Sequence, residues 1–487
     1  MVGIKSRIKS IIPAFIIGIL TFVFSMVCSN TLWYRGNTGT DSSVFMYVAR
    51  VILNGGMPYL DTFDHKGPLI YLINVLGLLI SEYRGIYVIE LITIFITFVF
   101  IYKIARLKCD EKISLLILFL TSSALFKYFE LGNLTEEYAL PFITISIYIF
   151  ADYFLNKKIG IFRIMVCGFS FGAVCLLRPN MISVWLIMCI GVLVDSIRSK
   201  RMKELFKFIL YFLVGTFIVV LPIVTWLIVK GAFADFIDNY IIFNKVYSSN
   251  MSRSVMLAAR EQVFTYFISD VLLLFSIFIM IYLYFKERKY FDKLFIVYLF
   301  INVLFICISG RLYDHYGMII IPSLAYPLSC LLKELYNEKR DHIFSLCIIS
   351  YLLITIAIPK YILAVNKGFI DYSKRSQEFF NKIDIKIIEM IKNNTSLQDK
   401  IIVCGNNNII YNLSNRFAAS RYSFQVSAEI DEFKNKEFYD DLNKNLPKII
   451  VLPNDYFDYN KMLEFIYEHE YKELWYSSEK TIKVYKI

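Results

Sequence analysis

The residues most able to do chemistry lie close together in one short segment of the chain. This segment contains three carboxylates, a histidine and a lysine, namely Asp41, Asp61, Asp64, His65 and Lys66. An ionised carboxylate can take the proton from an attacking hydroxyl group. A lysine ammonium can stabilise the negative charge of a departing phosphate. Together these groups suit the transfer of a glycosyl group from a phosphate ester to a hydroxyl.

Two of these residues have favourable positions for that chemistry. Asp41 starts the predicted helix 41–54, in which apolar residues recur at helical spacing. The positive end of a helix dipole favours an ionised carboxylate, as a base requires. Lys66 comes just before the apolar stretch 68–80, which is too short to span a bilayer and is predicted to be a partly embedded helix. We therefore expect Asp41 to be the base and Lys66 to contact the phosphate.

Simpler interpretations exist for the same residues. Thr40 or Asp41 can be an ordinary cap of the helix. Asp61 and Asp64 can be turn residues. Lys66 can be an interfacial lysine whose ammonium extends to water. The sequence alone leaves both sets of interpretations open.

The composition indicates how these residues are held. Of the 487 residues, 57% are hydrophobic and 19% are charged, whereas soluble domains have about 25% charged residues. The net charge of +11 comes from Lys and Arg in short clusters between apolar runs, not from one continuous basic face as in a nucleic-acid-binding protein. The nine cysteines form no C-x-x-C pair, so we expect buried thiols and no metal site. These features predict a polytopic protein among membrane lipids, with no nucleic-acid partner.

About eleven apolar runs are predicted to cross the membrane as helices, each needing about 20 residues. They are residues 11–29, 85–105, 113–128, 137–155, 164–177, 181–197, 208–229, 263–285, 294–309, 318–332 and 343–359. The first run is interpreted as an uncleaved membrane helix. It is long for the apolar part of a signal peptide, and no A-x-A cleavage site follows it.

The basic clusters predict the orientation of these helices. When the predicted spans alternate, Lys5, Arg7 and Lys9 fall on the same side as five later basic segments. These segments are 106–112, 157–163, 198–207, 286–293 and 333–340. The positive-inside rule assigns this side to the cytoplasm. An odd number of spans then places the C-terminal region outside, and we expect a multi-pass protein of the plasma membrane.

Two large segments are therefore expected outside the cytoplasm. Residues 30–84 form the first outer loop of a transmembrane domain predicted to cover residues 1–365. Residues 366–487 have a soluble composition and are predicted to form a small α/β domain. Its predicted strands are 400–404, 447–452, 472–476 and 481–487, and its predicted helices are 376–392 and 459–470. Residues 405–408 (Gly-Asn-Asn-Asn) can approach a ligand with their backbone, although a plain strand-to-helix turn is the simpler interpretation.

The outer-loop sequence TDSSVFMYVARVILNGGMPYLDTFDHKGPLIYL resembles a known family. It is similar to the first extracytoplasmic loop of GT-C glycosyltransferases of the protein O-mannosyltransferase and aminoarabinose-transferase (ArnT-like) type. The resemblance implies that Asp41 is the catalytic acid of the family's motif. It also implies that Lys66, in the element Lys-Gly-Pro-Leu, is the basic residue that contacts the lipid phosphate. The chain departs from the pattern at Ser42, where many members have a second acid, and at Gly67, where the family has proline.

Two further motifs extend the resemblance. The segment SGRLYDHYGMIIIPSL contains Arg311, His315 and Tyr316, and the segment LLRPN contains Arg178. Both resemble outer elements of bacterial relatives, which implies that the two arginines bind phosphate; a guanidinium donates two hydrogen bonds at once. The simpler interpretation is that they anchor the chain at the membrane interface. Glu136, on the same predicted side, is a candidate for orienting the acceptor.

The sequence thus predicts an all-α polytopic membrane protein of GT-C type, with about eleven transmembrane helices and a small C-terminal extracytoplasmic α/β domain. The reaction that the resemblance implies moves a sugar from a polyprenyl-phosphate donor to a lipid, glycan or protein acceptor, with inversion at the sugar carbon. We expect substrate contacts from Tyr59, Asp61, Asp64, His65, Glu136, His315 and Tyr316. No cofactor is required, and a divalent metal is left open. The alternatives are a flippase or transporter of lipid-linked glycans, and a glycan polymerase or ligase.

Overall fold

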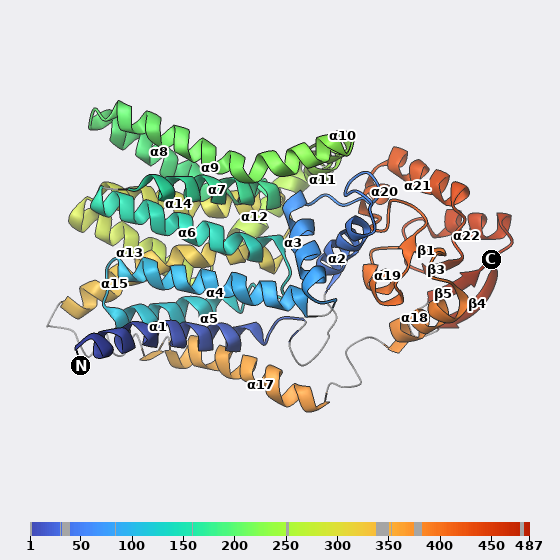
Figure 1. Cartoon of the computed structure of the whole chain (residues 1–487), viewed down its shortest axis with the longest axis horizontal. Helices are drawn as coiled ribbons and strands as arrows, with labels where there is room; N and C mark the ends of the chain where they lie inside the picture. The colour runs from blue at the N-terminus through green and yellow to red at the C-terminus, as the bar shows by residue number, and fades with distance from the viewer. Residues whose placement is uncertain are drawn as a thin grey trace. The chain divides into compact units, whose positions relative to one another are not determined.

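The structure, a computed structural model, describes residues 2–29, 31, 39–82, 84–157, 159–249, 253–337, 350–351, 353–374, 382–477 and 482–487. The chain folds into two compact units, each built from three separate segments (Figure 1). Unit 1 consists of Met1–Cys28, Tyr87–Ile223 and Met251–Tyr372, and unit 2 consists of Ser29–Ile86, Val224–Asn250 and Ser373–Ile487.

Unit 1 is a bundle of helices formed by the apolar runs of the sequence. Its α-helices are α1 (Val2–Ser25), α4 (Gly85–Arg106), α5 (Glu111–Leu125), α6 (Thr135–Asn156), α7 (Ile161–Leu177), α8 (Ser183–Arg198), α9 (Met202–Val229), α12 (Arg253–Ile268), α13 (Val271–Glu287), α14 (Tyr290–Cys307), α15 (Ile321–Asn337) and α17 (Ile358–Lys374). Shorter turns are the 3-10 helices η1 (Pro179–Met181) and η3 (Asp314–Ile320) and the π-helix η4 (Leu353–Ala357).

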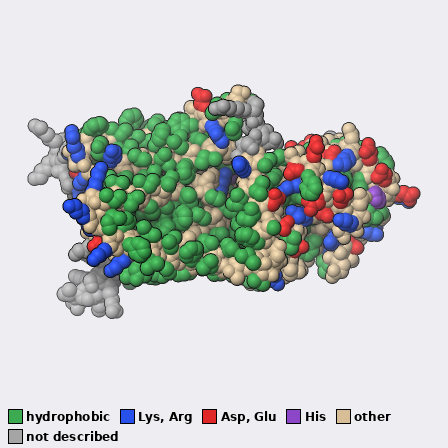
Figure 2. All heavy atoms as spheres, turned by 90° about the horizontal axis from the view of Figure 1, so that it is seen from above, with side chains coloured by type: hydrophobic (Ala, Val, Ile, Leu, Met, Phe, Trp, Pro, Cys, Tyr) green, Lys and Arg blue, Asp and Glu red, His purple; other side chains and the backbone are tan. Residues whose placement is uncertain are grey.

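Five helices of the described chain are long and apolar enough to cross a membrane, or up to six if one bent pair is a single span. They are α4, α6, α9, α14 and the continuous segment Asp314–Leu335. Hydrophobic side chains cover most of the face of unit 1 seen in Figure 2, as lipid contact requires. The total of eleven spans stays a prediction. Part of the predicted span 343–359, and part of the predicted helix 376–392, lies outside the described residues.

The predicted span 263–285 is not one continuous helix, because the chain bends there by 75° between α12 and α13. Asp270 is the N-cap residue of α13, just after α12 ends at Ile268. Its side chain accepts hydrogen bonds from the backbone N–H groups of Leu272 and Leu273, which satisfies donors that a new helix leaves unpaired. A polar capping residue within an apolar run thus divides it into two helices.

Close backbone contact joins α7 to α9. A Cβ atom added to Gly168 would lie 1.9 Å from the Phe212 carbonyl oxygen, and one added to Gly215 would lie 2.0 Å from that of Met165. Small residues at facing positions let two membrane helices approach closely enough for extensive van der Waals packing. Glycine is therefore required on both helices.

The basic segments of unit 1 lie together at one end of the bundle. Lys157, after α6, forms an ion pair with Asp195 of α8 at 2.9 Å, and the Arg198 guanidinium lies over the Tyr290 ring. Figure 2 shows Lys and Arg side chains gathered at this end. The alternation of spans predicted this grouping, and the assignment of the end to the cytoplasm stays a prediction.

Unit 2 combines the first outer loop, a later loop and the C-terminal α/β domain. Its helices are α2 (Thr40–Leu53), α3 (Pro68–Ile80), α10 (Phe233–Phe236), the π-helix η2 (Ile237–Ile242), α11 (Phe243–Ser249), α18 (Lys382–Asn394), α19 (Asn408–Ser414), α20 (Val426–Ile430), α21 (Glu432–Lys444) and α22 (Tyr459–Glu468). Its strands are β1 (Lys400–Val403), β2 (Phe417–Ala418), β3 (Ile449–Pro453), β4 (Lys472–Ser477) and β5 (Ile482–Lys486).

These strands form one five-stranded sheet in the order β2-β1-β3-β5-β4. β1 pairs in parallel with both β2 and β3, placing Ile402 opposite Ile450, while β5 runs antiparallel to β3 and β4. The C-terminal region therefore contains the predicted small sheet, with helices and strands near the predicted ranges. The elements between β1 and β3, namely α19, β2, α20 and α21, were not predicted.

Hydrogen bonds join the segments of unit 2 that are remote in sequence. The Tyr47 hydroxyl of α2 accepts from the Ala418 backbone N–H at 2.9 Å, and Arg50 donates to the Tyr411 carbonyl oxygen at 2.9 Å. The Lys434 ammonium of α21 contacts Asp238 of the later loop at 2.9 Å. The α/β domain therefore packs directly against the outer loop that carries Asp41.

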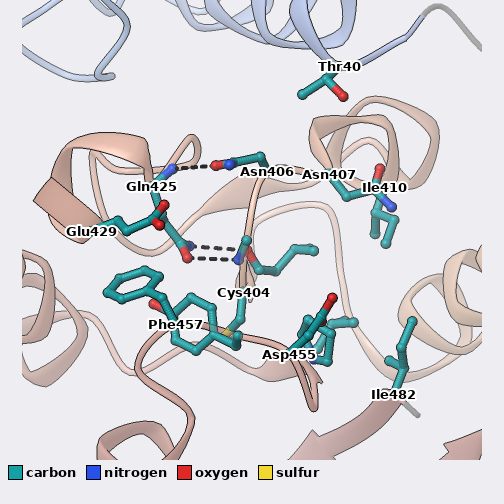
Figure 3. A pocket seen from close by; sticks show the side chains of 15 residues that line it. Thr40, Cys404, Asn406, Asn407, Ile410, Gln425, Glu429, Asp455, Phe457 and Ile482 are labelled. Carbon is teal, nitrogen blue, oxygen red and sulfur yellow. Dashed lines mark hydrogen bonds between the residues drawn. The ribbon is translucent and has the colours of Figure 1, made fainter. Parts of the chain in front are cut away.

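A cavity of about 440 Å³ opens in unit 2 at the carboxyl ends of β1 and β3 (Figure 3). Its lining includes Cys404, Asn406 and Asn407 after β1, and Asp455 and Phe457 after β3. The parallel pairing of the two strands brings these loops to the same edge of the sheet.

Candidate active site

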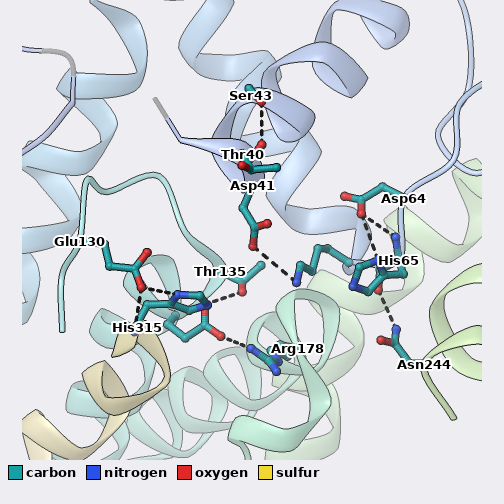
Figure 4. A network of polar contacts seen from close by, with 12 residues as sticks. Thr40, Asp41, Ser43, Asp64, His65, Glu130, Thr135, Arg178, Asn244 and His315 are labelled. Carbon is teal, nitrogen blue, oxygen red and sulfur yellow. Dashed lines mark hydrogen bonds and ion pairs between the residues drawn. The ribbon is translucent and has the colours of Figure 1, made fainter. Parts of the chain in front are cut away.

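Asp41 lies in the first turn of α2, and Gly39 occupies the N-cap position with φ +75°. The expectation that Thr40 or Asp41 caps the helix is therefore wrong, because glycine readily adopts this left-handed conformation. Among the described residues, no backbone N–H donates to the Asp41 carboxylate. Instead, Asp41 Oδ2 lies 3.7 Å from Lys66 Nζ, with side chains 35% and 15% exposed (Figure 4). Folding thus pairs the predicted base with the predicted phosphate-binding lysine.

Two tyrosines hold Lys66 in place through its backbone. The hydroxyls of Tyr59 and Tyr71 both donate to the Lys66 carbonyl oxygen, at 2.7 and 3.2 Å. Gly67 then serves as the N-cap of α3, with Pro68 in the first turn, a position where proline costs no hydrogen bond. Tyr59 has φ +69° and is buried, and burial raises the pKa of its phenol. In this structure Tyr59 therefore positions Lys66.

Asp64 is a buried carboxylate beside this pair. Its Oδ1 accepts from the His65 backbone N–H at 2.7 Å, and its Oδ2 accepts from the Tyr71 hydroxyl at 2.9 Å. Burial raises the pKa of Asp64 from 3.8 to about 6, and the nearby Lys66 ammonium partly opposes this increase. The group therefore changes charge in the mildly acidic range.

His65 is buried among aromatic rings of unit 2. Its ring stacks on Phe424 of the α/β domain at a centroid distance of 6.0 Å. Asn244 of α11 donates to the His65 carbonyl oxygen at 2.7 Å. Asn244 and Tyr71 were not predicted from the sequence: Asn244 belongs to no quoted motif, and Tyr71, although within the outer-loop segment, has no charged group that would mark it. Three segments of unit 2 thus converge on the backbone of the predicted site.

Asp61 stabilises a turn. Its Oδ2 accepts from the Met57 backbone N–H at 2.6 Å, which is the arrangement expected of a turn aspartate. The Asp61 side chain is otherwise exposed. The observed contact matches the simpler interpretation of this residue, and a substrate contact stays a prediction.

A second polar group lies in unit 1 where α6 begins and α7 ends. Arg178 forms an ion pair with Glu136, whose side chain is only 2% exposed (Figure 4). The Arg178 guanidinium lies over the Tyr316 ring, 3.9 Å from its centroid, and the Thr135 hydroxyl donates to Glu136 at 2.8 Å. Stacking and pairing together fix the plane of the guanidinium.

His315 belongs to the same end of unit 1. Its Nδ1 lies 2.8 Å from Glu130 Oε1, and its ring packs edge-on against Tyr316 at 4.8 Å between centroids. Arg311 lies between α14 and η3, and its side chain is half-buried. Unit 1 therefore brings Glu136, Arg178 and Tyr316 into one cluster with His315 beside it.

Each of the two units thus has its own cluster of charged side chains. Unit 2 offers a carboxylate next to an ammonium, and unit 1 offers a fixed guanidinium. Within the described part of the chain, no group of three or more His, Cys, Asp or Glu side chains could hold a metal ion.

The chain also matches known proteins. Residues 4–345 match the family described as "Putative competence-induced protein Ccs4 N-terminal domain". None of the curated proteins matches the chain by sequence.

Solved structures share its fold. ArnT from Cupriavidus metallidurans bound to undecaprenyl phosphate superposes with a TM-score of 0.62 at 11% identity, covering 98% of this chain and 97% of ArnT. The Archaeoglobus fulgidus oligosaccharyltransferase in complex with Zn and sulfate has a TM-score of 0.56 at 13% identity, covering 97% of this chain and 73% of that one. The archaeal oligosaccharyltransferase AglB from Archaeoglobus fulgidus, in complex with an inhibitory peptide and a dolichol-phosphate, has a TM-score of 0.51 at 11% identity over 97% and 74% of the two chains. The ArnT-like fold expected from the sequence is therefore confirmed.

Proposed function

Because the chain belongs to the family of the Ccs4 N-terminal domain and shares its fold with ArnT and an archaeal oligosaccharyltransferase, we propose that it is a membrane glycosyltransferase of GT-C type. Its donor is a sugar carried on a polyprenyl phosphate, and its acceptor is a hydroxyl of a cell-envelope lipid, glycan or protein. The observation that carries this proposal is the Asp41–Lys66 pair at 3.7 Å. The lipid phosphates bound in the ArnT and AglB structures support it.

The proposed step exchanges one bond at the anomeric carbon for another and moves one proton. The acceptor hydroxyl gives its proton to the Asp41 carboxylate while its oxygen bonds to the anomeric carbon of the donor sugar. The bond from that carbon to the phosphate oxygen breaks, and its electron pair stays on the polyprenyl phosphate. The Lys66 ammonium stabilises the charge that the phosphate gains. Attack from the side opposite the phosphate inverts the sugar carbon.

The ion pair between the two residues fits this division of roles. A donor phosphate competes with the Asp41 carboxylate for the Lys66 ammonium, since both are anions. Once Lys66 pairs with the phosphate, the carboxylate is available to accept the acceptor's proton. The hydrogen bonds from Tyr59 and Tyr71 hold the Lys66 backbone whichever anion the ammonium contacts.

The remaining predicted residues have supporting roles in this proposal. Arg178 and Arg311 bind the donor phosphate, since a guanidinium can bind two phosphate oxygens at once. The sugar is contacted by Tyr59, Asp61, Asp64 and His65, and the acceptor by Glu136, His315 and Tyr316. The reaction takes place outside the cytoplasm at the plasma membrane, in a transmembrane domain 1–365 followed by the extracytoplasmic domain 366–487.

Replacing Asp41 tests the proposal in cells that lack the native chain. Cells carrying Asp41→Asn are expected to lose one envelope glycosylation that the native chain restores, with transfer reduced about 10²–10⁴-fold, because the amide cannot take the proton. Mass spectrometry of lipids, glycans and proteins of the envelope measures the modification. Asp440→Asn, the same change at an exposed position of α21, is the matched control and should restore it fully.

The proposal fails if Asp41→Asn restores the modification as well as the native chain does, at equal protein levels. If Asp41→Asn instead keeps the transport of a lipid-linked glycan across the membrane, and only transport is lost on deleting the chain, the protein is a flippase.

A further inference from the structure

The cavity in the α/β domain lies at a special position of the sheet. From β1 the chain passes through α19 to β2 on one side, and then through α20 and α21 back across to β3 on the other side. The connections leaving β1 and entering β3 thus diverge. In open α/β sheets, ligands bind at the carboxyl ends of strands where such a divergence occurs.

Gln425 shapes the wall of this cavity from a buried position. Its Nε2 donates to the Val403 carbonyl oxygen at 3.1 Å, and its Oε1 accepts from the Gly405 N–H at 2.9 Å. Its own backbone N–H donates to the Asn406 side-chain oxygen at 3.0 Å (Figure 3). These bonds fix the loop after β1, so the cavity is a formed site and not a loosely packed turn.

The same bonds orient the Asn406 side chain, which lines the cavity, so that its NH₂ group can donate to a ligand. Its side-chain oxygen is occupied by Gln425, while no group among the described residues accepts a hydrogen bond from its NH₂. Gly405 has φ +94°, and an added Cβ there would meet no atom within 4 Å. The loop therefore presents donors beside open space.

The side chains that line the cavity determine which class of ligand it can bind. Glu429 and Asp455 line the cavity together with the amides of Asn406 and Asn407, and among the described residues of its lining there is no Lys, Arg or His. Phosphate and other anions are therefore disfavoured. Carboxylates and amides instead suit a ligand that carries several hydroxyl groups on neighbouring atoms, because each carboxylate accepts several hydrogen bonds. Phe457, a residue that is 40% exposed, offers an aromatic face to an apolar sugar face.

We infer that this cavity binds an uncharged saccharide unit. Its volume of about 440 Å³ lies within the range of about 300–1,000 Å³ usual for small-ligand sites. Thr40, which directly precedes Asp41, also lines the cavity. This assignment rests on the proposed function. The bound saccharide unit belongs to the acceptor, and the cavity holds the acceptor next to the helix that carries the base.

Binding of the full-length protein, in lipid nanodiscs, to an array of neutral and acidic bacterial saccharides tests this inference. The native chain is expected to bind at least one neutral saccharide, with no competition from inorganic phosphate. Asn406→Ala and Asp455→Asn should each weaken that binding about fivefold to tenfold, the usual effect of one lost hydrogen bond. Asn443→Ala, at an exposed position of α21, should bind like the native chain.

The inference is overturned if no neutral saccharide binds, if only phosphorylated or acidic saccharides bind, or if both cavity variants bind normally. Each variant is first compared with the native chain by size-exclusion profile and melting temperature. A misfolded Asn406→Ala is replaced by Asn406→Ser, which keeps a polar side chain. Asp41→Asn should bind the saccharide normally, so a failure of catalysis by Asp41 and a failure of saccharide binding give different results.

Discussion

The buried carboxylate of Asp64 gives a quantitative prediction about the pH dependence of stability. Burial raises its pKa from 3.8 to about 6 in the folded chain. The folded state therefore binds this proton more tightly than the unfolded state does. The resulting stabilisation is fully present below pH 3.8 and is lost as the pH rises through 6. Asp64→Asn cannot titrate and removes this contribution.

The size of the effect follows from the same two pKa values. Proton linkage gives about 1 kcal/mol of stabilisation at pH 5 relative to pH 7. Between pH 7 and pH 5, the melting temperature of the native chain should therefore rise by about 1 °C relative to that of Asp64→Asn. Lys66 and Asp41 lie close enough to influence Asp64, and both are present in the two proteins compared.

Thermal unfolding of the two purified proteins in detergent, followed by tryptophan fluorescence at several pH values from 5 to 8, measures this difference. Asp440→Asn, exposed on α21, should show a constant difference from the native chain. If the melting temperatures of the native chain and Asp64→Asn also keep a constant difference over this range, Asp64 does not titrate as a buried carboxylate and the argument is refuted.

Two further predictions concern packing in unit 1. Arg178→Ala leaves the buried Glu136 carboxylate without its ion-pair partner and should destabilise the protein by about 3–5 kcal/mol. Adding Glu136→Gln to this variant should restore part of the lost melting temperature. An Arg178→Ala variant with the melting temperature of the native chain would contradict this prediction. Gly215→Ala places a Cβ 2.0 Å from the Met165 carbonyl oxygen and should sharply reduce the yield of monodisperse protein in size-exclusion chromatography. Gly18→Ala, with no atom within 4 Å of the added Cβ, should keep the native yield, and equal yields would show that α7 and α9 do not need close contact.

The elements that carry the candidate site follow closely from local sequence signals. The helix predicted at 41–54 is α2, Thr40–Leu53, and the short apolar helix predicted at 68–80 is α3 with the same bounds. Proline in the first turn and glycines after the last turn are strong local signals, because they limit the backbone angles directly.

Other elements could not be predicted because their signals are weak or not local. β2 has two residues and α20 has five, so neither shows a recognisable period. The bend at Asp270 depends on a single polar residue that accepts two backbone hydrogen bonds. One polar residue changes the mean hydropathy of a long apolar run only slightly. The hydropathy of the run therefore does not reveal the bend.

The sequence by itself determined that most of the chain is apolar helix, where the basic segments lie between the helices, and which residues could act as base and cation. These properties depend on residue type and on spacing along the chain. Only the tertiary structure decided that Asp41 meets Lys66 and that Asp64 is buried against Tyr71. It also placed a cavity at the edge of the sheet beside α2. These features arise from contacts between residues far apart in sequence, which depend on how the segments pack together.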